Sequence, residues 1–273
     1  MLKVDYSPDE LIVTCISRQI RNGDLVAQGI ATPLVAVGYL LARCTHAPDL
    51  SFISAIGQSL CQEPAPIGLA RVEALWLENA VARLGFVAAV TELLPRTQPK
   101  EFFRPGQMDA AGNFNNVAIG KNHTRPLLRL PGTGGIPDVT TYGDGIYLYV
   151  PRHSRVTFVE RLDFLSGLGH NPARTRGRGP CYLITDLGQF DFASDRMRLV
   201  TNHPGVTVAR VREKTGFPLE ISADLHETPP PTAEELRLLR EEIDPLRVRR
   251  LELLSGPARK ELLREILEKE GAL

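Results

Sequence analysis

Three consecutive segments near the N-terminus alternate between strand and helix patterns, and this order constrains the fold more than any other feature of the chain. The apolar runs DLVAQGIA (24–31) and DLSFISAI (49–56) each predict a short strand. Between them, TPLVAVGYLLARCT (32–45) predicts a helix that begins at Thr32 and Pro33. A strand, a helix and a strand in this order indicate a βαβ unit with a parallel sheet.

Later segments extend the same pattern. Ser7 and Glu10 form a predicted capping box at the start of a helix that ends at Gly23. Further helices are predicted over 72–94 and 206–217, and strands over 145–150, 155–167, 180–194 and 197–208, the last two forming a hairpin across 194–196. We therefore expect an α/β fold with a single twisted, largely parallel sheet and helices on both faces.

The C-terminal segment has a different composition, rich in Leu, Glu and Arg. Thr232 and Glu235 form a second capping box, and the leucines that follow recur at helical spacing. We expect one main domain over residues 1–228 and a helical extension over 229–273 that packs on it.

Charge and composition exclude several classes of function. The 273 residues contain 32 Lys and Arg and 32 Asp and Glu, so the net charge is zero. Binding to nucleic acid or to an anionic membrane through the overall charge of the protein is therefore not expected. Four distant cysteines and six scattered histidines contain no metal-binding spacing, so no metal is expected and the cysteines are interpreted as reduced. The acidic N-terminus does not resemble a signal peptide and no apolar run could span a membrane, so we expect a cytoplasmic protein.

The stretch LRLPGTGGIPD (128–138) has three interpretations: a pyrophosphate-binding loop, a thioester-binding loop, or a plain turn. A dinucleotide fingerprint needs a third glycine where Pro137 stands, and an acid about 20 residues further on, which is missing. A P-loop would need a following GK[ST]. The loop taken alone favours the plain turn.

A wider resemblance changes that interpretation. GTGGIPD resembles the GxGGAxD stretch of the B-type subunits of the family I CoA-transferases, the family of glutaconate CoA-transferase. Six other stretches resemble the same subunits in the same order: 46–53, 109–115, 155–170, 182–192, 203–208 and 229–245. The resemblance implies an A-type partner subunit in a heterodimer or heterotetramer and coenzyme A, as acyl-CoA, for the substrate. It also implies that Gly132, Gly134 and Gly135 face the thioester and supply backbone N–H donors.

The nucleophile of the family is missing from its usual place. In the transferases a glutamate of the B-type chain attacks the thioester, and its position here falls on Ala55. Glu63 is the nearest acid downstream, and we interpret it as a solvated loop residue. We therefore assign no catalytic residue to this chain. Three hypotheses stay open: one half of a transferase, one half of a ring-opening type acyl-CoA hydrolase whose glutamate lies on the A-type partner, and a non-catalytic scaffold.

The remaining polar candidates are interpreted as structural. Asp138 is expected to cap the helix after the glycine loop. His170 and His203 are expected to be structural, as are four residues of one turn: Gln107, Asp109, Asn113 and Asn115. The stretch ARTRGRG (173–179) is interpreted as a flexible surface loop.

Overall fold

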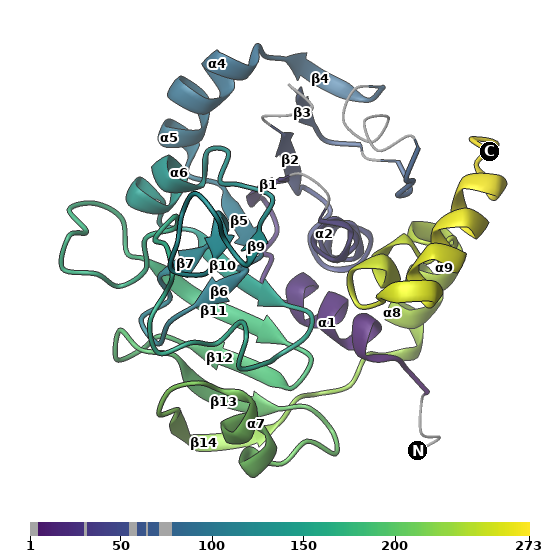
Figure 1. The fold of residues 1–273 in the computed structure, drawn as a ribbon. Coiled ribbons are helices and arrows are strands. Elements are labelled where there is room, and N and C mark those ends of the chain that lie inside the picture. The colour runs from purple at the N-terminus through teal and green to yellow at the C-terminus, as the bar shows by residue number, and fades with distance from the viewer. Residues whose placement is uncertain (1–4, 30–31, 55–58, 64, 71–77) are drawn as a thin grey trace. The chain divides into compact units, whose positions relative to one another are not determined.

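The computed structural model describes residues 5–29, 32–54, 59–63, 65–70 and 78–273, which form two compact units (Figure 1). The first unit comprises residues 1–93 and 230–273, and the second comprises residues 94–229. Both units contain strands and helices, so the expected α/β class is confirmed. None of the described helices is long and apolar enough to cross a membrane.

The first unit contains the strand–helix–strand segment predicted at the N-terminus. β1 (Leu25–Ala27) pairs in parallel with β2 (Ser51–Ser54), and α2 (Pro33–Thr45) connects the two strands. β3 (Ser59–Cys61) pairs antiparallel with β2, and β4 (Ala80–Arg83) pairs antiparallel with β3. The predicted βαβ unit is therefore present.

The helices α1 (Pro8–Ser17) and α2 pack closely against each other. An added Cβ at Gly38 of α2 would lie 2.5 Å from the Ile16 side chain of α1. Both helices are lined by fully buried apolar side chains, including Ile12 and Leu41. Their contact forms the core of the first unit.

Both predicted capping boxes are present in the first unit. The Ser7 N–H donates to the Glu10 carboxylate at 2.9 Å, and the Thr232 N–H donates to the Glu235 carboxylate at 2.6 Å. The Thr232 hydroxyl in turn accepts from the Glu235 N–H at 3.1 Å. Four helical segments follow along the C-terminal part of the chain: α8 (Ala233–Arg237), the π-helical η2 (Leu238–Ile243), the 3₁₀ segment η3 (Val248–Glu252) and α9 (Gly256–Lys269).

The second unit contains six strands that pair in the order β14, β13, β12, β11, β10, β5. β10 pairs in parallel with both β5 and β11, β12 pairs antiparallel with β11 and β13, and β13 pairs in parallel with β14. The strand bounds are β5 (Lys100–Phe103), β10 (Ile146–Val150), β11 (Pro180–Thr185), β12 (Gly188–Asp191), β13 (Arg198–Asn202) and β14 (Glu220–Glu227). Their buried apolar side chains form one cluster that includes Leu148 and Phe190.

Shorter elements lie outside this set of strands. They are α5 (Leu94–Thr97), β6 (Gln107–Met108), β7 (Phe114–Asn115), β8 (Ala118–Ile119), β9 (Leu128–Arg129), α6 (Ile136–Tyr142) and α7 (Val208–Lys214). β6 pairs with β7 and β8 pairs with β9, both antiparallel. The β8–β9 pair leads into the glycine loop and then into α6, which contacts α5 (Figure 1).

Several predicted elements are wrong. Of the predicted helix over 72–94, residues 72–77 lie outside the described residues. The described part forms strand β4, followed by two short helical segments, α4 (Phe86–Ala88) and the π-helical η1 (Ala89–Leu93). An apolar run without breakers suits a helix and an edge strand equally, and the pairing with β3 decides the outcome. The run 180–194 is two strands, β11 and β12, instead of one.

The predicted strand over 155–167 is also wrong. This segment makes only two isolated bridges among the described residues, from Phe158 to Met108 and from Gly167 to Phe114. Phe158 is fully buried, and an added Cβ at Gly167 would lie 2.3 Å from the Phe114 ring. The alternating apolar residues thus pack against the β6–β7 pair without joining a sheet.

Candidate functional site

The glycine loop, residues 131–135, is largely exposed and is not constrained by packing. Gly132 and Gly134 have φ of +105° and +50°, which side chains rarely adopt. An added Cβ at Gly132, Gly134 or Gly135 would have no atom within 4 Å. The glycines are therefore explained by backbone conformation at two positions, and the space beside all three is open.

The N–H groups of the loop are used unequally. The Gly132 N–H donates to the Asn116 carbonyl at 2.8 Å, so it is committed to the fold. Gly134 and Gly135 donate to no acceptor within the part of the chain that the structure describes. Two of the three glycines proposed from the sequence thus have donors available for a ligand, and the third holds the loop in place.

Asp138 does not cap α6 as expected. Gly135 is the N-cap residue, and Asp138 lies in the first turn of the helix with an exposed side chain. An acid there still interacts favourably with the helix dipole. The Thr140 hydroxyl, fully buried, donates to the Ile136 carbonyl at 2.7 Å and accepts from the Leu168 N–H at 3.0 Å.

The polar residues of the turn between β6 and β7 hold the chain together, as predicted. The Asp109 carboxylate accepts from the N–H groups of Ala111 and Asn113 at 2.9 and 3.0 Å. The Asn113 side-chain oxygen accepts from the Gly169 N–H at 2.9 Å, which links this turn to the segment over residues 168–179. Burial raises the pKa of Asp109, against the hydrogen bonds from Asn113 and Ala111.

Gln107 and Asn115 extend the same network. The Asn115 amide donates to the Gln107 side-chain oxygen at 2.8 Å, and the Gln107 amide donates to the Asp163 carboxylate at 2.9 Å. Asp163 also accepts from the Gly120 N–H at 3.0 Å. Because these groups bond to one another, the network positions backbone and leaves few polar atoms for a ligand.

The arginine-rich loop, residues 168–179, is more ordered than the sequence suggested. The guanidinium of Arg174 makes five hydrogen bonds, all to backbone carbonyls of this loop and of α6: Leu168, Gly169, Arg176, Thr140 and Thr141. Arg176 and Arg178 are exposed. A surface depression of about 660 Å³ is lined by the loop, including His170. The prediction of a flexible loop is therefore wrong for Arg174.

His170 and His203 both bond to groups of the fold, which is what their expected structural role requires. His170 has Nε2 at 2.8 Å from the Pro180 carbonyl and Nδ1 at 3.0 Å from the Asp195 carboxylate. His203 is buried, with Nδ1 at 2.9 Å from the Thr228 hydroxyl. Burial lowers the pKa of His203 to about 4.

Sequence reasoning missed a second buried histidine, His153. Its two ring nitrogens lie 3.2 and 3.0 Å from the hydroxyls of Thr185 and Thr215, and its ring stacks on Phe158 with centroids 3.8 Å apart. Burial lowers its pKa to about 3. Its hydroxyl partners stand 32 and 62 residues away, so no sequence pattern marks it.

Glu101 on β5 was also missed. Burial raises its pKa to about 7, and its carboxylate makes no hydrogen bond or ion pair among the described residues. The nearby Tyr142 hydroxyl is buried without a hydrogen-bond partner in the same part of the chain. Burial, Glu101 and Asp138 raise the pKa of Tyr142. In the sequence, Glu101 follows Lys100 in a strand, and this pattern does not indicate that the acid is buried.

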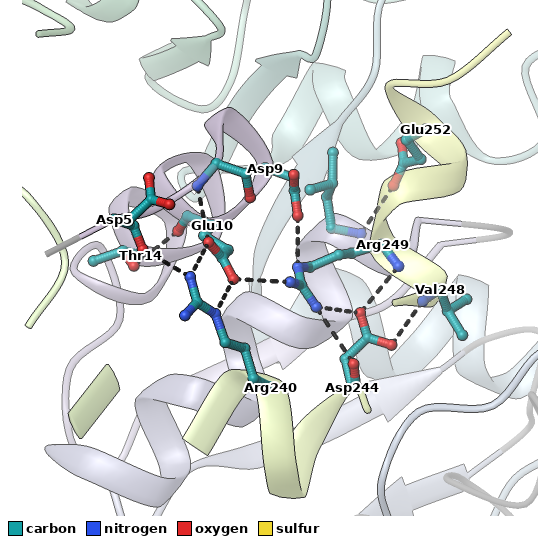
Figure 2. Close-up of polar contacts among 11 residues, drawn as sticks. Asp5, Asp9, Glu10, Thr14, Arg240, Asp244, Val248, Arg249 and Glu252 are labelled. Atoms are coloured by element: carbon teal, nitrogen blue, oxygen red, sulfur yellow. Dashed lines mark hydrogen bonds and ion pairs between the residues drawn. The ribbon is translucent and has the colours of Figure 1, made fainter. Parts of the chain in front are cut away.

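The first unit contains a buried ion cluster (Figure 2). The Arg249 guanidinium lies 2.8 Å from Asp9, 2.9 Å from Asp244 and 3.2 Å from Glu10, and its side chain is only 3% exposed. Arg240 lies 2.7 Å from Glu10. These contacts bind the C-terminal segment to α1. Burial by itself raises the pKa of Glu10, but Arg240, Ser7 and Arg249 together lower it.

The position of the family's nucleophile, Ala55, lies outside the described residues. Glu63 is exposed, as expected for a solvated acid. Within the described ranges, no three His, Cys, Asp or Glu side chains come together as metal ligands. All four cysteines are free, Cys15 and Cys61 buried and Cys44 and Cys181 exposed.

Comparison with known proteins gives consistent matches over nearly the whole chain, although no family model matched. The B-type chain of glutaconate CoA-transferase from Acidaminococcus fermentans is 31% identical over 88% of this chain and 94% of its own. The solved enzyme from that organism superposes with a TM-score of 0.79 at 25% identity, over 92% of this chain and 99% of that one.

Two further relatives carry other activities in their names. The cholesterol ring-cleaving hydrolase IpdB subunit from Mycobacterium bovis is 33% identical over 90% of this chain and 98% of its own. The crystal structure of the decarboxylase AibA/AibB superposes with a TM-score of 0.78 at 30% identity, over 90% of this chain and 98% of that one. The chain therefore belongs to the family I CoA-transferases, among their B-type subunits.

Proposed function

We propose that this chain is the B-type subunit of a heteromeric enzyme that acts on acyl-CoA thioesters together with an A-type partner. The names of its relatives support both parts of the proposal, since they describe CoA-transferase and hydrolase subunits and a paired AibA/AibB enzyme. The observation that carries it is the exposed glycine loop, in which the N–H groups of Gly134 and Gly135 have no acceptor within the described residues.

The chemistry of thioesters explains why such a loop would be useful. Attack on the thioester carbon turns the carbonyl oxygen into an oxyanion, which backbone N–H groups stabilise. The open space beside Gly132, Gly134 and Gly135 lets an acyl-CoA carbonyl approach the backbone closely. Each such donor typically contributes about 10²–10³ in rate.

The residue at position 55 bears on the reaction type. Its side chain is a methyl group, which cannot attack a thioester, so a covalent glutamyl-CoA intermediate would need a carboxylate from elsewhere. This favours hydrolysis as the second candidate within the same proposal. A water oxygen then bonds to a carbonyl carbon of the acyl-CoA while a base on the partner takes the water proton. At the thioester carbon the C–S bond breaks and the proton passes to the CoA thiolate; at a ring ketone the ring C–C bond breaks and the proton passes to the departing carbon.

The test uses the complex of this chain with its A-type partner. The complex is incubated with a panel of acyl-CoAs, with and without acceptor carboxylic acids, while free thiol and new acyl-CoA are measured and covalent adducts are sought by mass spectrometry. CoA exchange between acids with a glutamyl-CoA adduct supports a transferase. Loss of the acyl-CoA without an acceptor acid, either as free CoA or as a new ring-opened acyl-CoA, supports a hydrolase. No change in any acyl-CoA would contradict the proposal.

A variant of the loop tests its role directly. Gly134→Val places a β-branched residue at φ +50°, so the loop must change conformation, and we expect turnover to fall by about 10²–10³. The matched control is Gly205→Val, because Gly205 also has a positive φ, +77°, and open space around it. Equal turnover in the two variants would show that the loop does not stabilise the reacting carbonyl.

A further inference from the structure

We propose that Arg174 is a positioning residue that holds α6, and with it the glycine loop, in the arrangement used for catalysis. The inference rests on the proposed function of the loop, because only that function makes the loop's position matter for turnover. The sequence alone suggests a flexible surface arginine at position 174.

The Arg174 guanidinium donates hydrogen bonds only to backbone carbonyl oxygens among the described residues. Nε donates to the Gly169 carbonyl at 3.0 Å, and Nη1 donates to the carbonyls of Arg176 at 2.9 Å and Thr141 at 3.3 Å. Nη2 donates to the Thr140 carbonyl at 2.8 Å and also to that of Leu168. A planar guanidinium can serve several carbonyls at fixed angles, whereas an ammonium group cannot reproduce this arrangement.

Two of these carbonyls belong to the last turn of α6. Thr140 and Thr141 stand near the end of the helix, where carbonyl groups lack partners within the helix. A cation at this end also interacts favourably with the helix dipole. Arg174 thus provides donors for the carbonyl groups at the C-terminal end of α6. The N-cap of the same helix is Gly135 of the glycine loop.

Other contacts make the helix and the arginine-rich loop one assembly. The buried Thr140 hydroxyl connects the Ile136 carbonyl in the first turn to the Leu168 N–H in the loop. An added Cβ at Gly177 would lie 2.6 Å from the Gly143 carbonyl, so loop and helix end are in close contact there as well. Since α6 has only seven residues, fixing its last turn fixes its first.

The neighbouring arginines provide the contrast. Arg176 is exposed and its side chain has no hydrogen bond or ion pair among the described residues. Arg178 lies 3.9 Å from Asp144 with its side chain 83% exposed. Neither can hold α6, so a role for Arg174 is separable from the overall charge of the loop.

The experiment compares Arg174→Met, Arg174→Lys and the matched control Arg176→Met in the complex with the A-type partner. Hydrogen–deuterium exchange followed by mass spectrometry reports on peptides that cover residues 131–143. We expect faster exchange there in Arg174→Met, partial recovery in Arg174→Lys, and no change in Arg176→Met. Thermal midpoints verify that each variant is folded.

Steady-state kinetics with an acyl-CoA provide the second readout. A displacement of the loop should lower kcat by up to about 10²-fold and leave KM nearly unchanged, since donors to the oxyanion act in the transition state. Exchange over 131–143 that is the same in Arg174→Met and Arg176→Met would overturn the inference. Faster exchange with unchanged kcat would keep Arg174 as the anchor of α6 and would contradict the proposed function of the loop instead.

Discussion

The two units of the molecule bury polar groups in different ways. Among the described residues, the charged side chains with the least exposed surface all belong to the first unit, whereas Glu101 of the second unit keeps part of its surface exposed. Those of the first unit are Asp9, Glu10, Asp244, Arg249 and Glu252. The buried polar side chains of the second unit are neutral: Gln107, Asn113, Asn115, Thr140, His153, Ser166, Thr185, Thr201, His203, Thr215 and Thr228. The first unit thus joins its distant segments by charge, and the second holds its loops by neutral hydrogen bonds.

Two arginines illustrate the difference. Arg249 donates mainly to carboxylates (Figure 2). Its side chain is nearly inaccessible to solvent. Arg174 donates all five of its hydrogen bonds to backbone carbonyls of a surface loop and of a short helix. Loss of Arg249 leaves buried charges without a partner, whereas loss of Arg174 leaves neutral backbone carbonyls without one of their donors. The first should affect global stability and the second local order.

The largest expected effect is that of Arg249→Met. Three carboxylates lose their shared cation, and breaking such a buried pair typically costs about 3–5 kcal/mol. Urea denaturation of the variant and the wild type measures the difference in free energy of unfolding. Arg250→Met is the control, because its side chain has no polar partner in the described part of the chain.

Removing one of the buried carboxylates tests whether the stability lost in Arg249→Met comes from unpaired charge. Adding Asp244→Asn to Arg249→Met should recover part of the lost stability, since Asp244 is fully buried beside the arginine. If Arg249→Met costs no more than Arg250→Met, the carboxylates are hydrated and the contrast between the units is wrong.

A second prediction concerns acid and the neutral core of the second unit. His153 and His203 have folded pKa values of about 3 and about 4, whereas an unfolded histidine titrates near 6.5. As pH falls below about 6.5, only the unfolded chain takes up these protons, so stability is lost until the folded values are reached. At pH 5 each histidine should account for about 2 kcal/mol of lost stability relative to pH 7.

The measurement is the free energy of unfolding at pH 7 and at pH 5. In His153→Gln the loss between the two pH values should be about 2 kcal/mol smaller than in the wild type. The exposed His226 provides the control, and His226→Gln should show the full wild-type loss. An identical loss in His153→Gln and the wild type would mean that His153 is charged in the folded state.

The contrast between the units also explains what the sequence could predict. Local signals succeeded: the strand–helix–strand order at the N-terminus, and capping boxes at Ser7 and Thr232, depend on residues a few positions apart. Predictions failed for segments whose secondary structure depends on a distant partner. At 80–83 the pairing with β3 decides that the segment is a strand, and at 155–167 the burial of Phe158 decides how the segment packs.

The candidate site follows the same rule. The glycine loop could be recognised in the sequence because the positive φ at Gly132 and Gly134 selects glycine there. Arg174 was not visible, because its acceptors are backbone carbonyls that every residue has. The partners of Arg249 stand up to 240 residues away, at Asp9, so spacing carries no information about that cluster.

The smallest expected effect compares one helix cap in each unit. Thr232 begins α8 with a full capping box, whereas Thr207 begins α7 and accepts only from the Arg210 N–H at 3.2 Å. Thr232→Ala should cost about 1 kcal/mol or more, and Thr207→Ala less, because the Thr232 hydroxyl accepts at 3.1 Å as one half of a reciprocal pair, whereas the Thr207 hydroxyl makes a single, longer bond. The backbone N–H bond from residue 232 to the Glu235 carboxylate remains in the alanine variant. Denaturation curves in urea for the two alanine variants measure the difference. A larger loss in Thr207→Ala would show that neutral single bonds stabilise the second unit as strongly as charge-assisted pairs stabilise the first.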